Sequence, residues 1–120
     1  MKIVIVDDST AMRMIVKKTL RQAGFEGHVI TEADDGAKAL ASISASVPDL
    51  VLSDWNMPNM TGIQLLEALR AKGINVTFGF ITTEATPDMR AKAMGAGAKF
   101  LISKPFTPES FQEHLGPFIH

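Results

Sequence analysis

The segment PDLVLSDWNMPNMTG, residues 48–62, gives the clearest indication of the fold. Aliphatic residues dominate positions 49–53 without the polar alternation of a half-exposed strand, which is typical of a strand buried on both faces. Asp54 follows at once, and Pro58 and Gly62 then indicate a turn that leads into a helix. Open α/β sheets bind ligands beyond the carboxyl ends of their strands, so Asp54 is a candidate functional residue.

The rest of the chain repeats this strand and helix pattern. Further short aliphatic runs occur at residues 2–6, 28–31, 76–82 and 99–103. Capping residues, prolines and helical spacing of apolar residues predict five helices that begin near Ser9, Asp35, Gly62, Thr86 and Thr107. Apolar strands that alternate with helices predict one parallel sheet with right-handed crossovers and helices on both faces.

Length, charge and cysteine content exclude several classes of protein. The chain has 120 residues, 12 Lys and Arg against 13 Asp and Glu, and no cysteine. A net charge of -1 gives no electrostatic case for nucleic acid or an anionic membrane, and disulfides and thiol chemistry are excluded. The apolar run at residues 1–6 is too short for a signal peptide or a membrane span. We expect a cytoplasmic monomer with one domain over residues 1–120 and no output domain.

Polar residues stand at the ends of four predicted strands: Asp7 and Asp8, Asp54, Thr82 and Lys104. Each of these residues, taken alone, could belong to a turn, cap a helix or be solvated. Their occurrence together at the ends of four strands favours a functional site. Three carboxylates at one edge repel one another unless a hard cation such as Mg²⁺ lies among them. Asp54 could then attack phosphorus, and Lys104 and Thr82 could contact the phosphoryl oxygens.

Four segments together resemble the receiver domains of two-component response regulators, and the resemblance spans essentially the whole chain. They are IVDDS at 5–9, LVLSDWNMPNMTG at 50–62, ITTEA at 81–85 and SKPF at 103–106. The resemblance implies a flavodoxin-like three-layer α/β/α sandwich, with five helices and a five-stranded parallel sheet of order 2-1-3-4-5. The DWNMPNM segment is especially similar to stand-alone chemotaxis regulators of this family, which have no output domain.

The resemblance also implies the metal site and the phosphoacceptor. Asp54 would accept the phosphoryl group and contribute to Mg²⁺ binding. Asp8 would bind Mg²⁺ directly, and Asp7 would lie nearby or act through water. Asn56 would bind the ion through its backbone carbonyl.

The resemblance also implies which residues respond to phosphorylation, and they lie at the ends of the fourth and fifth strands. Thr82 would supply the switch hydroxyl and Lys104 would pair with the phosphoryl group, with a cis bond before proline. Family members commonly carry an aromatic residue three positions before this lysine, where this chain has Leu101 beside Phe100. Gly79 interrupts the fourth strand without a functional explanation.

The favoured function is a phosphorylation-dependent signalling switch. The resemblance implies a histidine kinase as donor, self-catalysed phosphorylation and dephosphorylation rather than classical enzyme activity, and an output protein docked on the face formed by the fourth helix, fifth strand and fifth helix. The pathway would be chemotaxis and motility, or another phosphorelay in which the protein acts as a phosphate sink or shuttle. A metal-dependent phosphohydrolase is less favoured, because haloacid-dehalogenase-like enzymes carry their nucleophile on the first strand.

Two further expectations concern single residues and one helix face. Trp55 is expected to be partly exposed and to point away from Asp54. The first helix is expected to bury an apolar stripe that includes Ile15, and to present a basic face for solvent or for a docked kinase. That face comprises Arg13, Lys17, Lys18 and Arg21.

Overall fold

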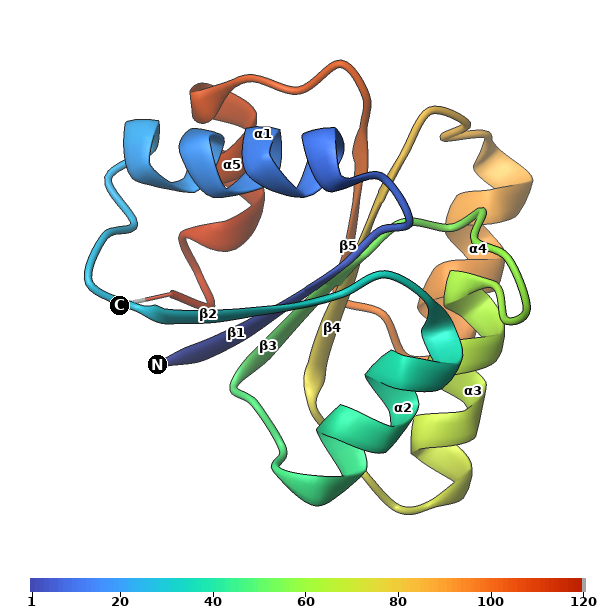
Figure 1. Cartoon of the computed structure of the whole chain (residues 1–120). Helices are drawn as coiled ribbons and strands as arrows, with labels where there is room; N and C mark the ends of the chain where they lie inside the picture. Colours follow the sequence, from blue (N-terminus) through green and yellow to red (C-terminus); the bar gives the residue numbers. More distant parts are fainter. Residues whose placement is uncertain (120) are drawn as a thin grey trace.

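The strand and helix segments fold in the predicted order. The computed structural model describes residues 1–119, and within them five strands alternate with five helices (Figure 1). The strands are β1 (Lys2–Val6), β2 (Val29–Ala33), β3 (Leu50–Ser53), β4 (Thr77–Thr82) and β5 (Phe100–Ser103). The helices are α1 (Thr10–Gln22), α2 (Gly36–Ala45), α3 (Gly62–Ala71), α4 (Pro87–Gly95) and α5 (Pro108–Leu115). None of these helices is long and apolar enough to cross a membrane.

The sheet is parallel throughout and has the strand order β2-β1-β3-β4-β5, as the sequence and its resemblance predicted. Helices α1 and α5 cover one face, and α2, α3 and α4 cover the other (Figure 1). Val6 lies opposite Ser53 in the β1–β3 register, and Thr82 lies opposite Ser103 in the β4–β5 register. The carboxyl ends of the strands are therefore level, and the residues that follow them share one edge.

The helices begin where capping side chains satisfy free backbone amides. Ser9 and Asp35 cap α1 and α2, as predicted, and Thr86 and Thr107 cap α4 and α5. The third helix begins at Gly62, as predicted, and its cap is Thr61, whose side chain accepts from the amide of Gln64. Local hydrogen bonds thus define the strand-to-helix turns.

The β4–β5 pair explains Gly79, for which the sequence offered no function. Gly79 lies opposite Phe100, and a Cβ atom at Gly79 would overlap the Phe100 ring. The ring packs instead near Phe118 and His114, with centroid separations of 5.8 Å and 6.5 Å. Leu101 points to the opposite face of the sheet and is buried in the core under α3 and α4. The aromatic residue of β5 therefore packs toward α5, and Gly79 provides the space for it.

Two expectations about apolar side chains were wrong. Trp55 is only 8% exposed, and its ring lies 4.8 Å from that of Phe80. The loop after β3 turns back so that the Gly62 amide donates to the Trp55 carbonyl at 2.8 Å, which directs the indole into the core. Ile15 is 47% exposed because the fully buried stripe of α1 is narrower than predicted and runs through Val16 and Leu20.

Candidate functional site

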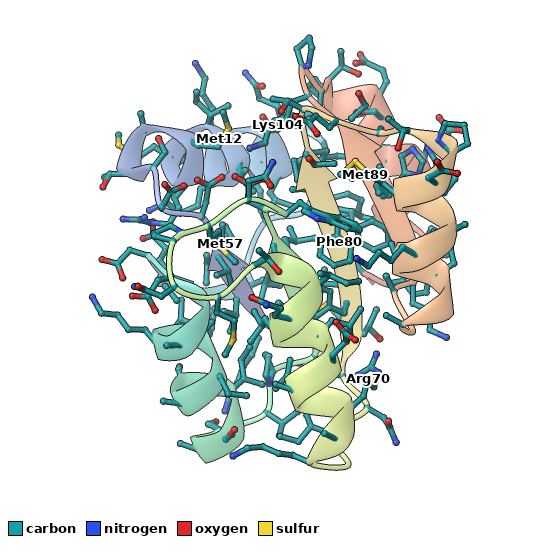
Figure 2. All side chains as sticks on the ribbon, turned by 90° about the vertical axis from the view of Figure 1, so that its right-hand side faces the viewer. Met12, Met57, Arg70, Phe80, Met89 and Lys104 are labelled. Carbon is teal, nitrogen blue, oxygen red and sulfur yellow. The ribbon has the colours of Figure 1, made fainter. Side chains whose placement is uncertain are left out.

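The predicted site residues gather at the carboxyl edge of the sheet. Backbone hydrogen bonds extend the strands by one residue, from the Asp7 amide to the Ala33 carbonyl at 3.1 Å and from the Asp54 amide to the Val6 carbonyl at 2.9 Å. Figure 2 shows Lys104 at this end of the molecule, beyond the labelled Phe80 of β4. The sheet thus brings residues from distant parts of the chain together on rigid backbone.

Three carboxylates form the acidic part of the site. Asp7, Asp8 and Asp54 each offer an oxygen atom, and these atoms lie within 4.8 Å of one another. Asp7 is buried, Asp54 is half-buried and Asp8 is exposed, so the cluster is open to solvent at Asp8. The clustering that the sequence predicted is therefore present, and the cluster is protected from solvent at Asp7 and accessible at Asp8.

Lys104 connects two of these carboxylates. Its Nζ lies 3.3 Å from Asp7 Oδ2 and 3.5 Å from Asp54 Oδ2, and the side chain is largely buried. The Lys104 amide donates to the Thr82 carbonyl at 2.7 Å, and the Lys104–Pro105 bond is cis. The ammonium group is therefore held beside Asp54 by the end of β5, within reach of any group attached to that carboxylate.

The surroundings of Asp54 disfavour its charged form. Burial raises the pKa of the Asp54 carboxyl above its usual value; Lys104 opposes this shift, and the Asp7 carboxylate adds to it. The Trp55 amide donates to Asp54 Oδ1 at 2.7 Å and also favours the carboxylate. The free carboxylate is thus an incompletely compensated charge, which an additional cation would stabilise.

This electrostatic cost predicts that Asp54→Asn stabilises the protein at neutral pH in magnesium-free buffer. The pKa of Asp54 is raised on folding, so its contribution to stability is fully present below about pH 3.8, the usual value. That contribution is lost as the pH rises through the raised pKa, because the unfolded state releases its proton first. Urea unfolding should show a higher free energy of unfolding for the variant at neutral pH, and a smaller difference in acid. Equal stabilities at neutral pH would contradict this expectation.

Thr82 and Asn56 lie at the predicted places, and in the part of the chain that the structure describes neither side chain is hydrogen-bonded to the acidic cluster. Thr82 is fully buried at the end of β4, and its hydroxyl oxygen accepts from the Glu84 amide at 3.2 Å. Within residues 1–119 this hydroxyl makes no hydrogen bond to Asp54. Asn56 is exposed in the loop two residues after Asp54. Their assigned roles toward a phosphoryl group and a metal ion stay predictions.

The predicted basic face of α1 is divided in the structure. Arg13 and Lys17 turn toward β2 and each contact a different oxygen of Glu32 at 3.1 Å. The hydrogen bond from Lys17 lowers the pKa of the Glu32 carboxyl, and Arg13 adds to this effect. Only Lys18 and Arg21 remain as the solvated basic residues that the sequence suggested, beside the exposed Met14.

Two residues near the site, Arg13 and Gly62, have contacts that the sequence did not predict. Arg13 Nη1 donates to the Asp7 carbonyl at 2.6 Å, although Arg13 was assigned to a solvated face. Gly62 was expected only to shape a turn, but a Cβ atom there would overlap the Asp54 carbonyl oxygen. Neither contact leaves a pattern in the sequence, because each depends on how the chain turns between the two residues.

Comparison with known proteins agrees with this geometry. Residues 3–116 match the family model described as "Response regulator receiver domain". The chain is 43% identical over 119 residues to "Chemotaxis protein CheY" of Pseudomonas aeruginosa, covering 96% of this chain and 93% of the relative. It is 44% identical over 119 residues to "Chemotaxis protein CheY-3" of Vibrio cholerae, with 96% and 88% covered.

Solved structures show the same fold. Chemotaxis response regulator CheY4 of Vibrio cholerae matches with a TM-score of 0.85 and 33% identity, covering 98% of each chain. The signal receiver domain of the response regulator NarL from Mycobacterium tuberculosis matches with a TM-score of 0.84 and 31% identity, covering 97% of this chain and 93% of the other. The likeness therefore extends over nearly the whole length of both proteins.

Proposed function

The chain belongs to the response regulator receiver domain family, and on that premise we propose that it accepts a phosphoryl group from a histidine kinase on Asp54. Phosphorylation-dependent signalling is the general activity that membership of this family, and likeness to chemotaxis regulators, implies. The observation that carries the proposal is the position of Lys104 Nζ, 3.5 Å from Asp54 Oδ2 inside a three-carboxylate cluster. We propose in addition that residues 1–120 form a single receiver domain.

The proposed reaction uses Asp54 as the nucleophile. A carboxylate oxygen of Asp54 attacks the phosphorus of a phosphohistidine, an O–P bond forms, and the P–N bond breaks. The imidazole keeps the electron pair of the broken bond and takes up a proton. The new acyl phosphate brings additional anionic oxygens into the site, where Lys104 can pair with one of them. A rotated Thr82 hydroxyl would donate to another and so report the modified state at the end of β4.

The donor set fits Mg²⁺. Each residue of the three-carboxylate cluster offers a hard oxygen atom, and the raised pKa of Asp54 supports the view that its charge lacks full compensation. Asp8 and Asp54 would bind the ion directly, Asp7 would lie nearby or act through water, and Asn56 would offer its backbone carbonyl. When bound, Mg²⁺ neutralises the carboxylates and so permits an anionic phosphoryl group to approach them.

Phosphoryl uptake with and without magnesium tests the proposed function. The wild-type protein, given Mg²⁺ and acetyl phosphate, is expected to gain one phosphoryl group, measured by intact-protein mass spectrometry. Excess EDTA should reduce the initial rate by at least about 100-fold, because the carboxylates then repel the donor. After dialysis to remove EDTA, addition of Mg²⁺ alone should restore phosphoryl uptake. Uptake that is unchanged in EDTA would overturn the magnesium assignment.

A phosphate sink or relay shuttle is the second candidate, and the burial of Leu101 favours it. Family members commonly carry an aromatic residue at the position of Leu101, which here is an aliphatic side chain buried in the core. The aromatic side chain that would move in response to phosphorylation is therefore absent from that position. An output protein that docks on the α4, β5 and α5 face stays the first proposal. A partner that binds the protein only with beryllofluoride would support output, and rapid loss of phosphate without such a partner would support the sink.

A further inference from the structure

We propose that Arg13 is a positioning residue for the magnesium site, because its guanidinium fixes the peptide unit that joins Asp7 to Asp8. Arg13 Nη1 donates to the Asp7 carbonyl oxygen at 2.6 Å. That carbonyl belongs to the Asp7–Asp8 peptide plane, so its direction sets where the chain carries the Asp8 side chain. This inference rests on the proposed binding of Mg²⁺ by these carboxylates.

The position of Asp7 at the end of β1 explains why its carbonyl uses a side-chain donor. The last strand-like bonds on the two sides of β1 run from the Asp7 amide to the Ala33 carbonyl and from the Asp54 amide to the Val6 carbonyl. Beyond them β3 turns away into its loop. The Arg13 side chain supplies the donor at the point where the ladder between the strands ends, and a buried carbonyl is thereby satisfied. Both backbone groups of Asp7 are therefore held.

Arg13 itself is held in one orientation. Its Nε lies 3.1 Å from Glu32 Oε1, its Nη2 donates to Thr10 Oγ1 at 3.1 Å, and its side chain is only 13% exposed. The three acceptors come from the end of β1, the start of α1 and the edge strand β2. The donors of a planar guanidinium lie on three separate nitrogen atoms in a fixed fork, whereas the three donors of an ammonium group share one nitrogen atom and cannot span the same three acceptors. The contacts therefore define a rigid brace from β2 to the Asp7–Asp8 peptide.

The direction in which an Arg13 substitution changes Mg²⁺ affinity distinguishes a positioning role from a purely electrostatic one. A guanidinium beside a cation site repels the cation, so removal of its charge alone would tighten Mg²⁺ binding. Loss of the brace would instead let the Asp7–Asp8 peptide rotate, which would weaken binding. Substitutions of groups that orient metal ligands commonly reduce affinity by about 10- to 100-fold. We therefore expect the positioning effect to exceed the electrostatic one.

Magnesium titration by calorimetry, together with melting temperatures in magnesium-free buffer, tests this role. Arg13→Met is expected to weaken Mg²⁺ binding about 10-fold. Arg13→Lys keeps the charge but cannot reach all three acceptors, so its affinity should lie between those of Arg13→Met and the wild type. Lys17→Met is the matched control, because Lys17 also contacts Glu32 at 3.1 Å without contacting Asp7. Its Mg²⁺ affinity should stay within about twofold of the wild type.

Each outcome supports or overturns the inference. Equal or tighter Mg²⁺ binding by Arg13→Met overturns it, and so does an equal loss in Lys17→Met, which would indicate a general effect of disturbing Glu32. If Arg13→Met does not fold, Arg13→Lys decides: an unchanged affinity overturns the inference and a weaker one supports it. A wild-type protein that fails to bind Mg²⁺ would remove the proposed function, whereas a binding wild type with an unaffected Arg13→Met would remove only this inference.

Discussion

Asp54→Asn is expected to abolish phosphoryl uptake from acetyl phosphate in the presence of Mg²⁺, with a loss of at least about 1,000-fold in initial rate. The amide has nearly the shape of the carboxylate and can still accept from the Trp55 amide, which lies 2.7 Å from Asp54 Oδ1. It lacks the anionic oxygen that attacks phosphorus. The measurement is the mass gained by the intact protein over time.

Asp49→Asn provides the matched control for this substitution. Asp49 precedes the opposite end of β3, where its Oδ2 accepts from the Lys2 amide at 2.7 Å, so the same chemical change there leaves the site intact. Uptake by Asp49→Asn should equal that of the wild type. Phosphoryl uptake that persists in Asp54→Asn and maps to another carboxylate, such as Asp8, would show that the nucleophile has been assigned wrongly.

Gly62→Ala is expected to lower the free energy of unfolding by about 3 kcal/mol, because the added methyl group overpacks a site that cannot expand. The new Cβ would overlap the backbone carbonyl oxygen of Asp54 and lie 2.8 Å from Phe80 Cε1. The Gly62 amide donates to the Trp55 carbonyl at 2.8 Å, which ties this turn to the end of β3. Displacement of the Asp54 backbone should slow phosphoryl uptake as well. Urea unfolding and the mass assay measure the two effects.

Gly95→Ala is the control for the glycine substitution. Gly95 is the last residue of α4, and a Cβ atom there would meet nothing within 4 Å apart from its chain neighbours and the backbone of its own helix. Alanine is favoured over glycine in helices, so this variant should be more stable by about 0.5 kcal/mol and should take up phosphate normally. A Gly62→Ala protein as stable as the wild type would show that the Asp54 backbone and the loop after β3 can move apart freely.

Most of the fold could be predicted because its signals are local or periodic. A cap such as Ser9 or Thr107 acts within three residues of itself, and buried parallel strands appear as aliphatic runs. The strand order came from the resemblance to a family rather than from such signals. The errors occurred at Trp55 and Ile15, whose burial depends on how a loop turns and how wide a stripe the sheet covers.

The site was predictable to the extent that it depends on topology. Parallel strands end at one edge, so Asp7, Asp54 and Lys104 had to lie near one another once the sheet was recognised. The acidic cluster and the position of Lys104 agree with that expectation. Arg13 was assigned to solvent because helical periodicity gives the direction of a side chain but not its partner. Its contact with the Asp7 carbonyl exists only because α1 begins directly after β1.

The alternation of strands and helices, with polar residues at the strand ends, follows from the order of the amino acids alone, since it depends on neighbouring residues and on burial pattern. The face of β5 that carries the aromatic residue depends instead on packing in three dimensions. Gly79 and Phe100 are 21 positions apart by their numbers, and their pairing across β4 and β5 leaves room for the ring toward α5. Leu101 then fills the other face. Packing between distant segments is a property of volume in three dimensions, and no local pattern specifies it.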